Sequence, residues 1–148
     1  MAVAIKLHND SVAAAKHRQA AVAAARARTL REQRLHQQQA QQREQKAERQ
    51  VEVTMRKSLE SQLDAAITKD ATHNADTGLL TSGPAQSTTC TPVSGGSSQN
   101  LSQSTGTYSC IAVYQTNSDG TQSGYRYGGT INFNSGEMTW QLGGGVGG

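Results

Sequence analysis

Apolar side chains recur at every fourth position between residues 51 and 67, at Val51, Met55, Leu59, Leu63 and Ile67. This spacing places one apolar stripe along a helix, with charged residues around it. Upstream, residues 12–35 are rich in alanine, and residues 36–50 contain no apolar residue except two alanines. Because neither glycine nor proline occurs before Gly78, we expect one uninterrupted helix over residues 11–67, with Asp10 or Ser11 as its N-cap.

A different pattern follows Gly78, where apolar and polar residues alternate as they do in strands. Three strands are predicted, over residues 107–115, 124–133 and 137–142. Short loops with turn residues, NSDG at 117–120 and NSG at 134–136, separate them and predict an antiparallel meander. A fourth strand is expected at the sheet edge over residues 87–91, ended by Pro92, and a polar, flexible segment should follow it.

A single small sheet needs a cover over its apolar face. The stripe between residues 51 and 67 is the only candidate in the sequence, so we expect an α+β fold. In this fold the C-terminal part of a long N-terminal helix packs on an antiparallel β-meander of three or four strands. The domain organisation follows: a basic helical segment rich in alanine and glutamine (residues 1–50), the α+β domain (residues 51–142) and a flexible glycine-rich tail (residues 143–148).

Charge is divided unevenly along the chain. Residues 1–57 carry a net charge of +7 and residues 58–148 a net charge of −4, which together give the +3 of the whole chain. The basic half is either a solvated helical surface or a contact for an acidic partner, and the residues for such a contact are Lys16, Arg18, Arg26, Arg28, Arg31 and Arg34. Because no aromatic residue is interleaved for base stacking, nucleic acid is the less favoured partner.

Five aromatic residues fall on the predicted strands: Tyr108, Tyr114, Tyr125, Tyr127 and Trp140. If some of them face solvent, they form a binding face for a glycan or a peptide. The alternative is that they form the core of the sheet and its cross-strand pairs.

Two cysteines, Cys90 and Cys110, allow only one intramolecular pairing. Closing a loop of this length with a disulfide is worth about 3 kcal/mol, and two free buried thiols are the alternative. No metal site, cofactor motif or catalytic residue is predicted. Asp70, His73 and Asp76, spaced by three, are better explained as the polar end of a helix. The sequence contains no apolar stretch long enough for a transmembrane helix and no recognisable secretory signal.

The segments LESQLDAAITKDA, TTCTPV, TGTYSCIAVY and DGTQSGYRYGGTINFNSGEMTWQLG together resemble the extracytoplasmic C-terminal domain of small, mostly uncharacterised membrane-anchored proteins of actinobacteria. The resemblance covers a little over half of the chain and implies that the two cysteines pair outside the membrane. It supplies no catalytic residue. Such proteins usually have a transmembrane helix before this domain, where the present chain has the polar residues 36–50.

These observations predict a non-catalytic structural or interaction protein, without a membrane span, whose helix mediates assembly or attachment and whose disulfide-tied domain is displayed. The expected partner is protein, either further copies of the chain or a larger particle such as a virion. An extracytoplasmic binding or sensing module that uses the aromatic face, and nucleic-acid contact through the basic segment, are the alternatives. The cysteine pair favours an oxidising or extracytoplasmic location.

Overall fold

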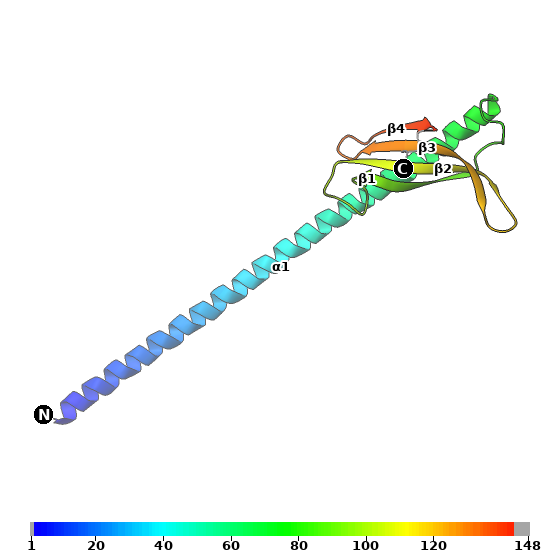
Figure 1. Cartoon of the computed structure of the whole chain (residues 1–148). Coiled ribbons are helices and arrows are strands. Elements are labelled where there is room, and N and C mark those ends of the chain that lie inside the picture. Colours follow the sequence, from blue (N-terminus) through cyan, green and yellow to red (C-terminus); the bar gives the residue numbers. More distant parts are fainter. Residues whose placement is uncertain (1, 144–148) are drawn as a thin grey trace. The chain divides into compact units, whose positions relative to one another are not determined.

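The computed structural model describes residues 2–143 and shows an α+β fold (Figure 1). Helix α1 spans Ala2–Asp76 and is followed by a four-stranded sheet. The strands are β1 (Ser87–Gly95), β2 (Thr105–Thr116), β3 (Gln122–Asn132) and β4 (Glu137–Leu142). The expected fold class is therefore confirmed. Of the predicted glycine-rich tail only Gly143 is described, and residues 144–148 lie outside the described residues.

Helix α1 is longer at both ends than the predicted helix over residues 11–67. Ser11 is not an N-cap, because it lies inside the helix and its hydroxyl donates to the carbonyl of His8 at 2.7 Å. At the other end the helix stops at Asp76 and is capped by Gly78, which has a φ of +80°. The cap is closed by bonds from the amide of Gly78 to Ala75 O and from the amide of Leu80 to Asn74 O.

The described chain divides into two units between Ala47 and Glu48. We call residues 2–47 the arm. Every side chain described in the arm, from residue 3 onward, is exposed. The second unit contains the remainder of α1 and the whole sheet. Among the described residues no helix contains an apolar stretch long enough to cross a membrane.

The sheet is an antiparallel meander with the spatial order β1-β2-β3-β4. Strand β4 has the predicted bounds, whereas β1 runs beyond Pro92 and does not end there. Pro92 still lies opposite Tyr108, and the register shifts between Pro92 and Ser94. Proline is tolerated in this place for two reasons. An edge strand has no ladder partner on one side, and the bulge interrupts the ladder on the other.

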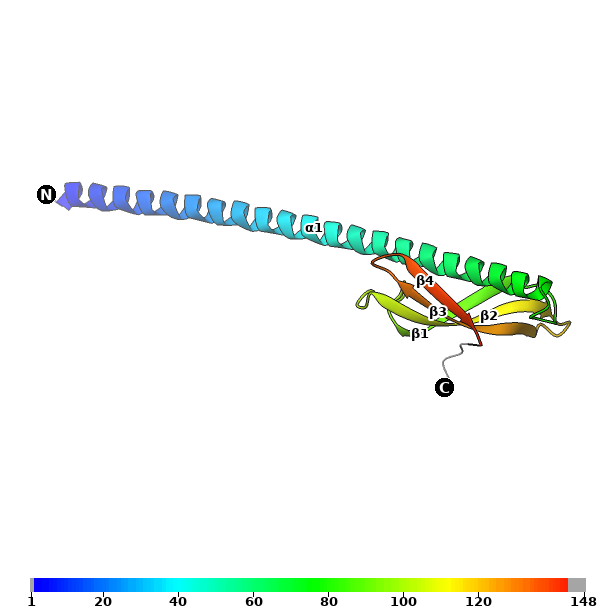
Figure 2. The same ribbon diagram turned by 90° about the horizontal axis from the view of Figure 1, so that it is seen from above.

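One face of the sheet packs on the C-terminal part of α1, as the view from above in Figure 2 shows. Two buried groups of side chains form the core: Leu63, Ile67 and Ala71 from the helix, and Tyr108, Cys110, Ala112, Tyr127, Ile131 and Phe133 from the sheet and the turn after it. The opposite face of the sheet is open, so Ile111 is 46% exposed although β2 is an inner strand.

The predicted apolar stripe is only partly correct. Leu59, Leu63 and Ile67 contact the core, but Val51 is 70% exposed and Met55 is 45% exposed. In their place the helix buries Arg56, which is 2% exposed. The sheet-facing side of the helix is thus rotated away from Val51 and Met55 toward a row of polar residues.

Candidate functional site

Helix α1 presents two parallel rows to the sheet, each with a spacing of about four residues. The apolar row is Leu59, Leu63, Ile67 and Ala71, and the polar row is Glu52, Arg56, Glu60, Asp64, Thr68 and Thr72. Residues four apart lie on one side of a helix, so each row forms a continuous line. The apolar row packs on the sheet, and the polar row contacts β1 and the segments on either side of it.

Arg56 begins these contacts by binding the loop between β1 and β2. One guanidinium nitrogen, Nη1, donates to the carbonyls of Gln103 at 2.8 Å, Asn100 at 3.0 Å and Ser97 at 3.3 Å. The other, Nη2, donates to Glu52 Oε1 at 2.6 Å and to the carbonyl of Leu101 at 3.3 Å. The planar, multidentate guanidinium suits this cage of carbonyls better than an ammonium group would.

The same guanidinium lies 4.4 Å from the centroid of the Phe133 ring, a cation–π contact. Arg56 therefore joins the loop to the turn after β3. The loop was expected to be flexible, but its backbone carbonyls converge on this one buried cation. That expectation was wrong because a polar loop sequence can be ordered by a side chain far away in the chain.

Glu60, one turn later, holds the start of the same loop and a core tyrosine. Its Oε1 accepts from the hydroxyl of Tyr108 at 2.8 Å and from the amide of Ser98 at 2.9 Å. Burial of Tyr108, with the acceptor carboxylate as a second cause, raises the pKa of this phenol far above its ordinary value of 10.0. The neutral, protonated phenol is therefore the form that the fold favours.

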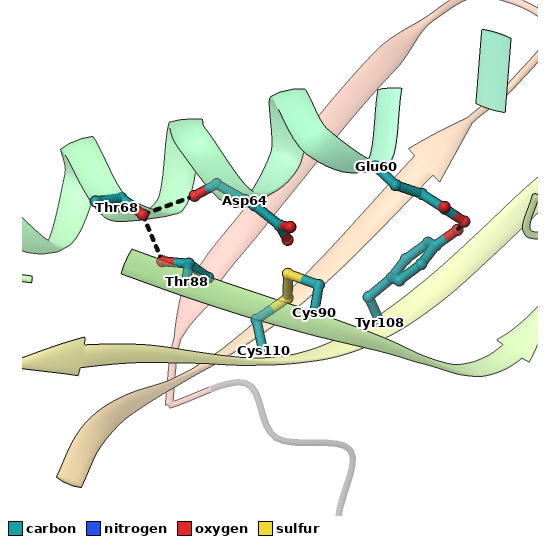
Figure 3. The surroundings of a disulfide bond; sticks show 7 residues. All are labelled: Glu60, Asp64, Thr68, Thr88, Cys90, Tyr108 and Cys110. Carbon is teal, nitrogen blue, oxygen red and sulfur yellow. Dashed lines mark hydrogen bonds between the residues drawn. A yellow bond between two sulfur atoms is a disulfide. The ribbon is translucent and has the colours of Figure 1, made fainter. Parts of the chain in front are cut away.

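Asp64 faces the disulfide between Cys90 and Cys110, as Figure 3 shows. The two cysteines lie directly opposite each other on β1 and β2, with a Cα–Cα distance of 4.0 Å. Oδ1 of Asp64 is buried and has no hydrogen-bond partner among the described residues. Burial raises the pKa of Asp64, Glu60 adds to the rise, and the backbone N–H of Cys90 opposes it.

Two threonines complete the polar row. The hydroxyls of Thr68 and Thr88 lie 2.7 Å apart and join α1 to β1 (Figure 3). Thr72 donates to the carbonyl of Ala85 at 3.3 Å, just before β1 begins. The polar row thus contacts the chain at points between Ala85 and Gln103, within the edge strand at Thr88 and on either side of it.

The structure separates the five aromatic residues instead of gathering them on one exposed face. Tyr108 and Tyr127 are 1% and 0% exposed and belong to the core. The hydroxyl of Tyr127 donates to Asp70 Oδ2 at 3.0 Å. Tyr108 and Tyr127 therefore do not belong to an exposed binding face, because both lie in the core between the sheet and the helix.

The other three aromatic residues are more accessible. Tyr114 and Tyr125 are half-buried, with ring centroids 4.7 Å apart, and the hydroxyl of Tyr125 donates to the carbonyl of Gly83 at 2.7 Å. Trp140, on edge strand β4, is 38% exposed. Its backbone borders a shallow hollow on the open face of the sheet, lined by Thr107, Gly128, Gly129, Thr130, Thr139 and Gln141.

The basic residues that were predicted to contact an acidic partner all lie in the arm and are exposed: Lys16, Arg18, Arg26, Arg28, Arg31 and Arg34. Over residues 2–47 the arm carries nine Lys and Arg against three Asp and Glu, a net charge of +6. Two of these arginines, Arg18 and Arg26, line a shallow, mostly apolar depression on the arm together with Val22 and Leu30.

Comparison with known proteins identifies no relative: no family model matches the chain, and neither a curated protein nor a solved structure matches it. Within residues 2–143 no three His, Cys, Asp or Glu side chains are grouped so that they could hold a metal ion.

Sequence reasoning missed the polar row as a set of buried contacts. The signal was present, since Glu52, Arg56, Glu60 and Asp64 follow one another at intervals of four. Charged residues with this spacing beside an apolar stripe usually form the solvated border of a helix. Only the position of β1 and the loop after it shows that Arg56 is buried and that Glu52, Glu60 and Asp64 are half-buried.

Proposed function

We propose that this is a non-catalytic interaction protein in which the arm associates with the arms of other copies and the disulfide-bearing domain is carried by the assembly. The observation that supports this proposal is the exposure of seven large apolar side chains in the arm, between 41% and 75% each: Val3, Ile5, Leu7, Val12, Val22, Leu30 and Leu35. Covering apolar surface contributes about 25 cal/mol per Å².

Physical arguments favour a helical partner for the arm. In proteins most of the stability of a helix comes from tertiary packing, and in the described residues the arm's side chains are not covered. Small side chains let helix backbones approach closely, and the arm is rich in alanine between residues 12 and 27. The apolar residues do not follow a strict heptad, so we expect a multi-helix assembly in preference to a two-stranded coiled coil.

Sedimentation velocity of the full-length protein tests the proposal. We expect oligomers in the wild type and monomers when the apolar depression is made polar by Val22→Gln with Leu30→Gln. Met55→Gln is the matched control, since Met55 is an exposed apolar residue on α1 outside the arm; this variant should assemble like the wild type. A wild-type protein that stays monomeric at high concentration would refute the proposal.

A second candidate function is contact with a polyanion, and the net charge of +6 on the arm favours it. The two candidates respond to salt in opposite ways. Association through apolar surface among like-charged arms should strengthen as salt screens their repulsion, whereas polyanion binding should weaken steeply through the loss of counterion release. Binding to immobilised duplex DNA or heparin distinguishes the two candidates. Retention that persists in the double variant Val22→Gln with Leu30→Gln, and is lost in the double variant Arg18→Gln with Arg26→Gln, would support polyanion binding.

We further propose that the domain works in an oxidising compartment, as the resemblance noted above implies. The disulfide between Cys90 and Cys110 supports this, because such bonds persist mainly outside reducing cytosol. Alkylation of free thiols in protein isolated without reductant tests it: no label is expected, and complete labelling of both cysteines would contradict it.

A further inference from the structure

We propose that the Cys90–Cys110 disulfide is a redox-sensitive switch on strand β1, and that Asp64 controls how readily a dithiol reductant opens it. This inference concerns the domain and does not depend on what the arm binds.

The position of the bond makes it the covalent tie of an edge strand. Strand β1 pairs only with β2, its register is irregular near Pro92, and the disulfide joins the two strands at Cys90 and Cys110. Besides the ladder, β1 is held to α1 by the bond between Thr68 and Thr88. Breaking the disulfide would therefore remove the covalent tie of β1 and leave this edge strand held by the ladder with β2 and by the contact with α1.

The two cysteines differ in exposure. Cys110 is completely buried, whereas Cys90 is half-buried. Exchange requires a thiolate to reach one sulfur, so we expect the reductant to attack Cys90 and the sulfur of Cys110 to be the leaving group. A thiolate leaving into a buried site needs a proton or a compensating charge.

Asp64 is the titratable group that faces this bond (Figure 3). On the helix its nearest acidic neighbour is Glu60, whose carboxylate is engaged with Tyr108 and the amide of Ser98. From the sheet, the hydroxyl of Thr88 is engaged with Thr68. Oδ1 of Asp64 remains buried beside the disulfide with no hydrogen-bond partner among the described residues, and burial raises the pKa of Asp64 against the lowering effect of the backbone N–H of Cys90.

Reduction then proceeds by thiol–disulfide exchange. A thiolate of the dithiol attacks Sγ of Cys90, the S–S bond breaks, and the electron pair leaves on Sγ of Cys110, which takes the carboxyl proton of Asp64. The second thiol of the reductant displaces Cys90 from the mixed disulfide, so the reductant ends as a disulfide and Cys90 takes a proton from solvent. When Asp64 is ionised, no proton is available there, and its charge repels both the incoming and the leaving thiolate.

The test measures how fast dithiothreitol reduces the full-length protein between pH 4 and pH 9. Alkylation of the released thiols reports the extent of reduction, and each rate is divided by the concentration of reductant thiolate at that pH. In the wild type this normalised rate should fall about tenfold as Asp64 ionises, a size set by repulsion between close charges. Asp64→Asn should give a flat profile. Glu60→Gln is the matched control. In this variant the normalised rate should still fall with pH, but at a lower pH than in the wild type, because Glu60 raises the pKa of Asp64.

Parallel profiles in the wild type and Asp64→Asn would overturn the proposal. If Asp64→Asn does not fold, the wild type alone decides: carbon NMR of the Asp64 carboxyl gives its titration, and a normalised rate that stays constant across that titration refutes the proposal. Hydrogen exchange of the reduced protein supplies the second readout. Faster exchange confined to residues 87–95 is expected, and unchanged protection of these amides would show that the bond does not act as a switch on β1.

Discussion

The side chain of Leu63 fills the space that any side chain at Gly129 would need. A Cβ added at Gly129 would lie 2.9 Å from Cδ2 and 3.2 Å from Cδ1 of Leu63, which is completely buried. Glycine usually weakens the middle of a strand, but here it brings the inner strand β3 close to α1. The contact fixes which turn of the helix lies over the centre of the sheet.

Gly129→Ala should therefore lower the free energy of unfolding, by about 1–3 kcal/mol, because it overpacks a dense core. Urea denaturation of the single variants and of the double variant with Leu63→Ala measures it. In the Leu63→Ala background the same substitution should cost much less, since the clash is gone. Equal costs in the two backgrounds would show that Leu63 is not the obstacle.

Replacing Arg56 should damage the loop between β1 and β2 more than any substitution of a neighbouring cation. We expect Arg56→Ala to lower the free energy of unfolding by about 3 kcal/mol, because the buried carbonyl of Ser97, several half-buried carbonyls and Glu52 lose their partner. Lys57→Ala is the control, since Lys57 is exposed on the same helix and should change stability by about 0.5 kcal/mol at most. Hydrogen exchange should localise the effect of Arg56→Ala to residues 96–104.

Stability should fall at alkaline pH through the buried tyrosines. The pKa values of Tyr108 and Tyr127 are raised by burial, so the unfolded chain ionises first, near the ordinary value of 10.0. Their contribution is complete below that pH and is lost as pH rises toward the pKa of the folded state. Urea unfolding at pH 8 and pH 11 measures the loss, which should be smaller in Tyr108→Phe than in the wild type. Identical losses would exclude Tyr108 as a source.

Trp140 should tolerate substitution better than a completely buried residue of the sheet. Because it is 38% exposed on an edge strand, Trp140→Ala should cost about 2 kcal/mol in the free energy of unfolding, less than a substitution at a completely buried position. Ile131→Ala, at a completely buried position on β3, is the comparison and should cost about 2–5 kcal/mol. Thermal denaturation ranks the two, and an unfolded Trp140→Ala protein would place Trp140 in the core instead.

Removing the disulfide should weaken the domain without changing its fold. The double variant Cys90→Ala with Cys110→Ala should lose about 3 kcal/mol, as expected for a bond that spans 20 residues. Urea denaturation measures the loss, and circular dichroism of the folded variant should keep the signature of helix and sheet. A loss of all sheet signal would show that the bond is required for folding itself.

The sequence alone determined the elements and their pairing. Uninterrupted helix formers before Gly78 predict the helix, and alternation with turn residues predicts the meander, because both signals are local and repeat many times. The turns at Gly120 and Gly136 have the positive φ that their sequences indicate. For the two cysteines the residues left a disulfide and two free thiols as alternatives, and the structure shows the disulfide.

Tertiary structure decided which residues of the helix are buried. Val51 and Met55 continue the apolar periodicity yet are exposed, while Arg56 is buried, because the loop carrying Ser97 and Gln103 brings its carbonyls to that position. Such a contact joins residues about 40 positions apart, and periodicity along the chain contains no information about it. The same holds for Asp64: its place in a helix follows from the sequence, but its position over the disulfide follows only from how the helix and the edge strand pack.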